Sequence, residues 1–375
     1  MVGAAEVGNL AELREDWASR FQTQGSACEG LGSHLYARLM EIIADDIRSG
    51  GPSWDVISDF SGLRYGQMGP LRLVGGAHRL AVSGEAPEWA ALMPSCGGEP
   101  PAEIERLRQA WLGLVDAHPD ALRSAMGREV QTNEVGRSAG LALALASTGF
   151  DECALIELGC SGGLNLRLDR FESDLAEVVL GEAGSALRLA PEMRSMVHGP
   201  GGALGLDPGL RIPEITSRVG IDPHPIDASS DEGSWTLSSF VWPDQTERFR
   251  RLTAALEIAA TCPVELVKVS SDPDGPDTAD ALRSVLDLEG PRAVQHSIVW
   301  QYIPTTVRWK LCRALEEAGR AATPDSPLAW IRYEPDEWNR ARAAIWLRTW
   351  PGGADRLIAH VDFHGRWLEP VPTLT

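Results

Sequence analysis

The residues best placed to do chemistry lie in a glycine-rich turn, Gly159-Cys160-Ser161-Gly162-Gly163. An apolar run with one acid, Glu157, precedes the turn, and Leu164-Asn165-Leu166 follows it. Such a run predicts a buried parallel strand, and the leucines predict a helix. Glycines let a ligand approach the backbone, and the first amides of a helix attract carboxylates, hydroxyls and phosphates. The sequence therefore predicts a cofactor-binding turn. Its candidate residues are Glu157, Gly159, Ser161, Gly163 and Asn165.

Three interpretations of this turn stay open. As E-x-G-x-S-x-G, it resembles the first motif of class I S-adenosylmethionine (SAM) methyltransferases, which usually have glycine where Ser161 stands. As G-x-S-x-G, it matches the nucleophile elbow of serine hydrolases, in which Ser161 would be the nucleophile. The third interpretation is a turn that binds no ligand, because glycine turns are common.

Polar residues follow three later apolar runs that have the pattern of strands. They are Asp222 after residues 218–221, Ser271 and Asp272 after 264–269, and Gln301 and Tyr302 after 294–300. Open parallel sheets bind ligands at the carboxyl ends of their strands. A carboxylate can accept two hydrogen bonds from ribose hydroxyls, and another can accept one from an adenine amino group. We therefore predict that Asp222, Asp272 and Gln301 also bind the cofactor.

Asp222 lies much farther from the glycine turn than the roughly 20 residues usual in dinucleotide-binding folds. The segment Ser173–Pro213 must then be an insertion, with a strand at Ala186–Leu189. Asp169 and Asp174 are rival ribose ligands. We rank Asp222 first because it ends a strand.

Methyl transfer to oxygen or nitrogen needs a well-placed acceptor and a base. The candidate catalytic residues are His364, Glu134 and Tyr302. Glu134 is predicted on a helix just before the first strand, and His364 follows the last strand-like run. His296 lies inside an apolar strand, which favours a structural histidine. A hydrolase would use Ser161, Asp272 and His364, but no strand is predicted before Cys153 and an elbow normally follows several strands.

The elements fall into two regions. Helical periodicity covers the first third of the chain, at residues 10–22, from 33 onward, at 103–115 and within 123–146. Ser33 is the expected N-cap of the second helix. Strands and helices alternate after Gly163, which predicts a mostly parallel sheet covered by helices. Pro351-Gly352-Gly353 predicts a C-terminal antiparallel hairpin between residues 343–350 and 356–363. Within this alternation, residues 241–260 are expected to form one helix.

The predicted fold class is therefore α/β, with a mostly parallel sheet similar to that of class I methyltransferases, a C-terminal hairpin and an N-terminal helical cap. The domains are expected at residues 1–130 for the cap and 131–375 for the sheet. The cap would cover the site and exclude water. The aromatic residues Trp242, Trp300, Tyr302 and Trp367 are candidates to line a substrate pocket.

The composition of the chain disfavours several classes of function. The 375 residues carry 34 basic and 53 acidic side chains, a formal charge of −19, which disfavours a nucleic-acid partner. None of the six cysteines has C-x-x-C spacing, so no zinc site is expected. Neither a signal peptide nor a membrane-spanning run is evident, and we expect a cytoplasmic protein without a membrane partner. The sequence does not indicate an oligomeric state.

Several longer segments carry a resemblance to a known family. They are TNEVGRSA (132–139), LIELGCSGGLNLRLDRF (155–171), RVGIDPHPID (218–227), VWPDQTERFRRLTAAL (241–256), HSIVWQYIP (296–304) and DFHGRW (362–367). The chain resembles a bacterial domain-of-unknown-function family, DUF2332, along nearly its whole length. That family is similar to SAM-dependent methyltransferases in its sheet domain, and it implies no established reaction. The leading expectation is SAM-dependent methylation of a small molecule. The alternatives are a catalytically silent SAM-fold binding protein and the serine hydrolase.

Overall fold

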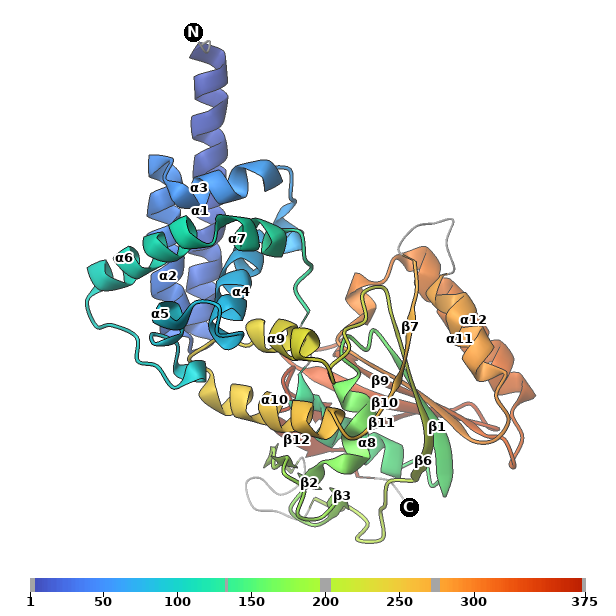
Figure 1. Cartoon of the computed structure of the whole chain (residues 1–375). Coiled ribbons are helices and arrows are strands. Elements are labelled where there is room, and N and C mark those ends of the chain that lie inside the picture. The colour runs from blue at the N-terminus through green and yellow to red at the C-terminus, as the bar shows by residue number, and fades with distance from the viewer. Residues whose placement is uncertain (1–3, 132–133, 196–203, 271–276, 373–375) are drawn as a thin grey trace. The chain divides into compact units, whose positions relative to one another are not determined.

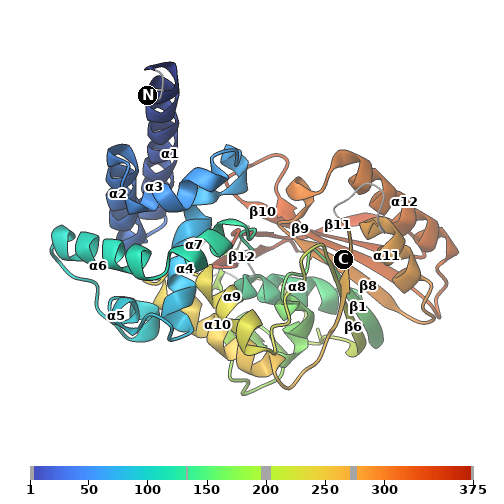
Figure 2. The ribbon, with the colours of Figure 1, turned by 45° about the horizontal axis from the view of Figure 1, so that its top comes forward.

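The chain folds into two compact units in the computed structural model, which describes residues 4–131, 134–195, 204–270 and 277–372 (Figures 1 and 2). The first unit is helical and comprises Met1–Thr132 together with Ser234–Arg250. The second unit contains the large sheet and comprises Asn133–Gly233 and Arg251–Thr375. Ser234–Arg250 was expected to belong to the sheet domain, and the structure assigns it to the helical unit.

The helical unit is built around amphipathic helices whose apolar faces meet in one core. The helices are α1 (Ala4–Gly30), α2 (His34–Ser49), α3 (Pro52–Ile57), α4 (Gly69–Val82), α5 (Pro87–Ala90), α6 (Ile104–Ala117) and α7 (Pro119–Met126), with most of α9 (Asp231–Ser239) and the start of α10 (Thr246–Ala259). Short 3₁₀ turns lie at Ser58–Phe60, Tyr65–Gln67 and Pro94–Cys96. Trp17, Phe21 and Trp111 are fully buried in this core.

Asp244 joins the inserted segment to the start of α2. Ser33 occupies the N-cap position but makes no capping hydrogen bond with its side chain. Its hydroxyl donates instead to Asp244 Oδ1 at 2.5 Å, and the Leu35 amide donates to Asp244 Oδ2 at 2.9 Å. Ser33 is therefore at the predicted N-cap position, but the capping hydrogen bond is made by a carboxylate more than 200 residues away.

His78 on α4 also bonds to this segment. Its Nδ1 lies 3.2 Å from the Ser239 carbonyl oxygen, and its Nε2 lies 2.7 Å from the Ser95 hydroxyl. Since a carbonyl can only accept, Nδ1 carries the proton and Nε2 accepts from Ser95. Complete burial lowers the pKa of His78 from 6.5 to about 4, so the ring is neutral at pH 7.

Lowering the pH should therefore reduce the unfolding free energy, because the buried His78 does not bind a proton in the native chain. Between about pH 6.5 and 4 the unfolded chain binds this proton and the native chain does not, so the unfolding free energy falls as the pH falls, by roughly 3 kcal/mol in total. We expect His78→Gln, whose side chain does not titrate, to lack this pH-dependent fall in the unfolding free energy. Urea unfolding of the whole chain at pH 7 and pH 4.5 measures the difference between wild type and variant. The exposed His34→Gln is the control, and an unchanged difference for His78→Gln would contradict the assignment.

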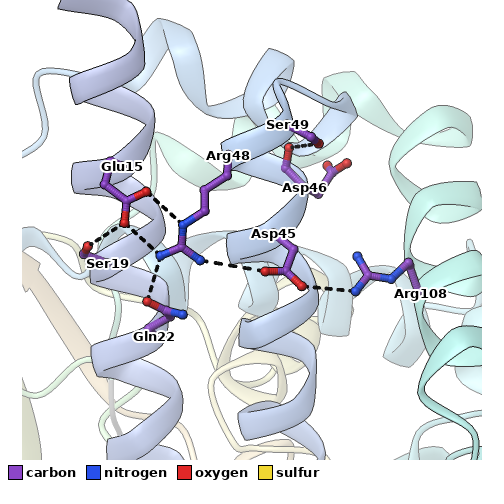
Figure 3. Close-up of polar contacts among 8 residues, drawn as sticks. All are labelled: Glu15, Ser19, Gln22, Asp45, Asp46, Arg48, Ser49 and Arg108. Carbon is purple, nitrogen blue, oxygen red and sulfur yellow. Dashed lines mark hydrogen bonds and ion pairs between the residues drawn. The ribbon is translucent and has the colours of Figure 1, made fainter.

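A network of charged side chains lies on the surface of the helical unit (Figure 3). Arg48 of α2 donates to both Glu15 carboxylate oxygens at 2.9 Å and to Gln22 at 2.8 Å, both on α1. Asp45 accepts from Arg108 of α6 at 3.2 Å. The side chains are solvated, so these pairs contribute little stability and chiefly fix how the helices are aligned.

The sheet unit is mixed α/β, with a large and mostly parallel sheet. Within the described residues, its nine strands lie in the order β5-β12-β11-β10-β9-β8-β1-β6-β7. Their bounds are β1 Glu152–Leu158, β5 Glu192–Met193, β6 Glu214–Asp222, β7 Glu265–Lys268, β8 Arg292–Ser297, β9 Leu328–Pro335, β10 Ala343–Trp350, β11 Asp355–Val361 and β12 Trp367–Pro370. The pairs from β7 to β9 are parallel, and β9 to β12 form an antiparallel meander. The predicted hairpin is thus β10–β11, and β12 extends it.

Helices cover both faces of this sheet. Helix α8 (Ser138–Ala146), which follows the 3₁₀ turn η4 (Val135–Arg137), packs on one face, while α11 (Thr278–Leu286) and α12 (Thr305–Ala321) pack on the other. The predicted helix at 241–260 is shorter in the structure, since α10 begins only at Thr246. A small sheet with the order β3-β2-β4 fills the predicted insertion. Its strands are β2 (Glu172–Asp174), β3 (Val179–Gly181) and β4 (Arg188–Leu189).

Candidate functional site

The glycine turn lies at the carboxyl end of β1, between its neighbours β6 and β8. Three of its residues have left-handed backbone angles, Gly159 (φ 68°), Ser161 (φ 51°) and Gly163 (φ 61°). A Cβ at Gly159 would also collide with the Val299 side chain, from the loop after β8. Glycine is thus required at 159 by the fold itself, apart from any ligand.

Two charged side chains fix the turn, Asp222 from strand β6 and Arg167 from the segment that follows the turn. Asp222, at the end of β6, accepts from the Ser161 amide at 2.9 Å and from the His224 amide at 2.7 Å. Arg167 donates to the Gly163 carbonyl at 2.9 Å and to the Cys262 carbonyl at 2.7 Å. Both side chains are buried, so the turn is held rigidly.

The segment after the turn differs from the prediction. Leu164–Arg170 forms a 3₁₀ helix, η5, with non-helical angles at Arg167, and not an α-helix. Such a short segment has little macrodipole, so the expected anion-attracting helix end is missing. A Cβ at Gly163 would meet Val264, Leu166 and Leu266, so this glycine faces the core and not a ligand.

A row of buried polar side chains lies beneath the N-terminus of α8. Glu157 of β1 and Gln295 of β8 are paired residues on adjacent parallel strands. The Asn165 side chain hydrogen-bonds the Glu157 carboxyl group, and its Oδ1 accepts from Ser138 at 2.8 Å. The Gln295 amide nitrogen donates to the Asn165 carbonyl at 3.3 Å. We name Glu157, Asn165 and Gln295 the buried polar row.

Burial determines the charge of Glu157. The side chain is 2% exposed, and desolvation raises its pKa from 4.5 to about 8, against the opposing effects of the Asn165 hydrogen bond and of Arg137. At neutral pH the protonated form is therefore favoured. A carboxyl group with such a pKa near the carboxyl end of a parallel strand is a typical feature of functional sites.

The segments that carry Glu134 and His364 meet in a close backbone contact. A Cβ at Gly136 would collide with the His364 carbonyl, and one at Gly365 with the Gly136 carbonyl. Arg137 strengthens the contact by donating to the Phe363 carbonyl at 2.9 Å. Glu134 is buried and accepts from the Gly136 amide at 3.1 Å, so it caps η4.

The turn that carries His364 is itself held by Asp362. This carboxylate accepts from the His364 amide at 2.9 Å and from the Arg366 amide and guanidinium. These hydrogen bonds outweigh the effect of burial and lower the pKa of Asp362 to about 2. Tyr333 adds a hydrogen bond from its hydroxyl to the Asp362 carbonyl. His364 is thus held in place by a rigid turn.

Other predicted site residues lie apart from this group. Gln301 and Tyr302 belong to the short 3₁₀ turn η6 (Trp300–Tyr302), and both are exposed, Tyr302 by 75%. Asp272 lies outside the described residues. Trp242 packs against Tyr36 inside the helical unit. The rival acid Asp169 pairs with Arg218 at 2.7 Å, and Asp174 pairs with Arg188.

The sequence did not reveal the partner of His296. Its Nδ1 lies 2.7 Å from Glu334 Oε1 at the end of β9, and its ring stacks on Trp300 at 4.7 Å. Glu334 also accepts from the Val299 and Trp300 amides at 3.2 Å, next to Ile298, whose φ of 51° is strained for a β-branched residue. Glu334 therefore fixes the loop that places Val299 against Gly159. Only tertiary contacts reveal this role.

The left-handed angle at Ser161 allows a substitution test. Ser161→Gly should keep the unfolding free energy within about 1 kcal/mol of the wild-type value. Glycine relieves the backbone strain, which stabilises the fold, and adds unfolded-state entropy, which opposes this gain. Ser161→Val should destabilise, since a β-branched residue resists this angle. Thermal unfolding compares the two variants. A well-folded Ser161→Val would contradict the turn geometry.

Comparison with known proteins gives a family. The profile of a family described as uncharacterized protein conserved in bacteria, DUF2332, matches residues 18–369. The chain belongs to this family. Neither the curated proteins nor the solved structures contain a match to the chain.

Two further observations concern the described residues, 4–131, 134–195, 204–270 and 277–372. Among these residues, no helix has the length and apolar character needed to cross a membrane. The same residues contain no cluster of three or more histidine, cysteine or acidic side chains able to hold a metal ion.

Proposed function

We propose that this DUF2332 protein is a SAM-dependent methyltransferase that acts on a small molecule, with its cofactor at the carboxyl edge of the sheet. The order of the parallel strands, β7-β6-β1-β8-β9, supports the proposal and resembles that of class I methyltransferases. The chain leaves β1 for β6 on one side, while β8 pairs on the other. Open sheets bind ligands at such a switch point.

Asp222 is the observation that carries the proposal. It ends the strand next to β1, and each of its oxygens accepts one backbone amide. A carboxylate has about four acceptor positions, so two remain for ribose hydroxyls. The amides hold the carboxylate in a fixed orientation, which reduces the entropy lost when a ligand binds.

The charges near the turn suit a cationic cofactor. SAM carries a sulfonium and an ammonium group. Glu134 and Asp222 supply buried carboxyl groups within the same unit, where charge interactions are strong. Glu157 is also buried and would ionise when a cation approaches it. The adenine contact predicted for Asp272 and the cofactor contact predicted for Gln301 complete the proposed cofactor site.

The proposed reaction transfers the methyl group directly from the cofactor to the acceptor. A nucleophilic atom of the acceptor attacks the methyl carbon, S-adenosylhomocysteine leaves, and a base takes the proton of the acceptor. His364 is the proposed base, since a rigid turn holds it and Glu134 lies on the contacting segment. Tyr302 is exposed and would contact the acceptor.

Titration with S-adenosylhomocysteine tests the proposal. At 100 times its dissociation constant the ligand should raise the unfolding free energy by about 2.7 kcal/mol. Methyl-labelled SAM, incubated with the protein and pools of small molecules, should then give labelled products. No binding at millimolar ligand to folded protein would contradict the proposal.

Two outcomes would favour the alternatives. Ligand binding without any labelled product, over a broad set of acceptors, would favour a silent SAM-fold binding protein. Covalent labelling by a fluorophosphonate that is lost in Ser161→Ala would favour the serine hydrolase.

A further inference from the structure

The buried polar row contains two oxygen atoms that have no hydrogen-bond partner among the described residues. They are Glu157 Oε2 and Gln295 Oε1. Both side chains are at most 2% exposed. Buried polar atoms are nearly always paired, so two in one place need an explanation.

The hydrogen bonds around them fix which atoms are acceptors. Gln295 Nε2 faces the Asn165 carbonyl, which can only accept, so the other amide atom of Gln295 must be the oxygen. Asn165 Oδ1 accepts from Ser138, so its amino group is the one that bonds to Glu157. If Glu157 were ionised, both unpaired atoms would be acceptors, without a donor among the described residues.

The register places these acceptors side by side. Glu157 and Gln295 are Cα partners on adjacent parallel strands, which lie about 4.8 Å apart, and paired residues point to the same face. One proton on Glu157 would turn one acceptor into a donor and pair both atoms. A ligand with a cationic N–H group could do the same.

We propose that Glu157 carries a proton at neutral pH, donates it to Gln295 Oε1, and releases it to solvent when the ammonium group of a ligand takes its place. The ligand part rests on the proposed function, because the ligand is an amino-acid-bearing cofactor such as S-adenosylhomocysteine. In the exchange, the carboxyl O–H bond breaks, the proton passes to buffer, and the ligand N–H donates to Glu157 and Gln295.

The charged and titratable groups near Glu157 agree with this exchange. They are Arg137 from η4, Arg167 from η5, Asp222 from β6 and Cys160 in the turn. The two arginines favour the ionised form, whereas Asp222 and burial oppose it. The α8 helix above the row carries no charged residue. An incoming cation would tip this balance toward the carboxylate.

Infrared spectroscopy tests the proton without any ligand. The wild-type chain should show the carbonyl stretch of a protonated carboxylic acid at pH 7, and the band should vanish as the pH rises past about 8. Glu157→Gln should lack it. The matched control is Glu152→Gln, an exposed glutamate on the same strand, which should retain it. Absence of the band from wild type at pH 7 would overturn the proposal.

Calorimetry in two buffers of different ionisation enthalpy tests the exchange. Binding of S-adenosylhomocysteine at pH 7 should release close to one proton. Below about pH 8, the affinity should therefore increase roughly tenfold for each unit by which the pH rises. Methylthioadenosine, which lacks the ammonium group, should release none, and neither ligand should release a proton from Glu157→Gln. Binding without proton release would overturn the exchange and leave the proposed function standing. Failure of the ligand to bind would count against the proposed function and overturn the exchange, while the infrared band would still decide whether Glu157 is protonated.

Discussion

Replacing Glu157 with glutamine should make the protein more stable at alkaline pH and change little at pH 5. The pKa of Glu157 is raised from 4.5 to about 8 by burial. Between these values the native chain binds the proton and the unfolded chain does not. The unfolding free energy of wild type should therefore fall as the pH rises through this window, by roughly 4–5 kcal/mol in total. Glutamine stays neutral, and its amide can donate to Gln295 as the carboxylic acid does.

Urea unfolding at pH 5, 7 and 8.5 measures this effect. The advantage of Glu157→Gln over wild type should grow steadily across the series. Glu152→Gln, exposed at the other end of the strand, should show no such trend. An advantage of equal size at every pH would mean that Glu157 does not titrate in this range, and would contradict the interpretation of the buried polar row.

Replacing Asp222 with alanine should weaken both the turn and the binding of the cofactor. The variant removes the acceptor of the Ser161 and His224 amides, and a buried amide left without a partner costs about 1–3 kcal/mol. If the same carboxylate holds the ribose, the affinity for S-adenosylhomocysteine should also fall by about ten- to a hundredfold. Asp222→Asn keeps one acceptor oxygen and should lie between alanine and wild type.

Thermal unfolding and calorimetric titration separate the two effects. Asp227→Ala is the matched control, because Asp227 lies exposed in the same loop and bonds only to nearby residues in the described structure. A loss of stability without a loss of affinity would limit Asp222 to supporting the turn. The ribose would then need another acceptor, and Asp222 would no longer support the proposed function.

The sequence predicted those elements that local patterns encode. Apolar runs predicted β1 and β7, and Pro351-Gly352-Gly353 predicted the β10–β11 hairpin. The alternation after Gly163 predicted the mostly parallel sheet, because its central strands β1 and β8 are buried on both faces and its crossovers include amphipathic helices. Glu157 and Asp222 were found for the same reason, since each lies at or near the end of a recognisable strand.

The remaining features depend on contacts between distant segments. Leu164–Arg170 forms a 3₁₀ helix in which Arg167 reaches the Cys262 carbonyl, 95 residues away. Asp244 replaces Ser33 as the cap of α2 from 211 residues away. The pairing of His296 with Glu334 likewise requires β8 and β9 to be neighbours. No local periodicity carries such information, so propensity alone predicts an ordinary helix, cap and core histidine at these positions.

A crystal structure of the whole chain grown with S-adenosylhomocysteine tests the central claim most directly. We predict ligand density along the carboxyl edge of the sheet, with the ribose hydroxyls on Asp222 and the amino group on Glu157. Density for the ligand at another place, or a folded protein that shows none at saturating ligand, would contradict the proposed cofactor site and with it the assignment as a methyltransferase.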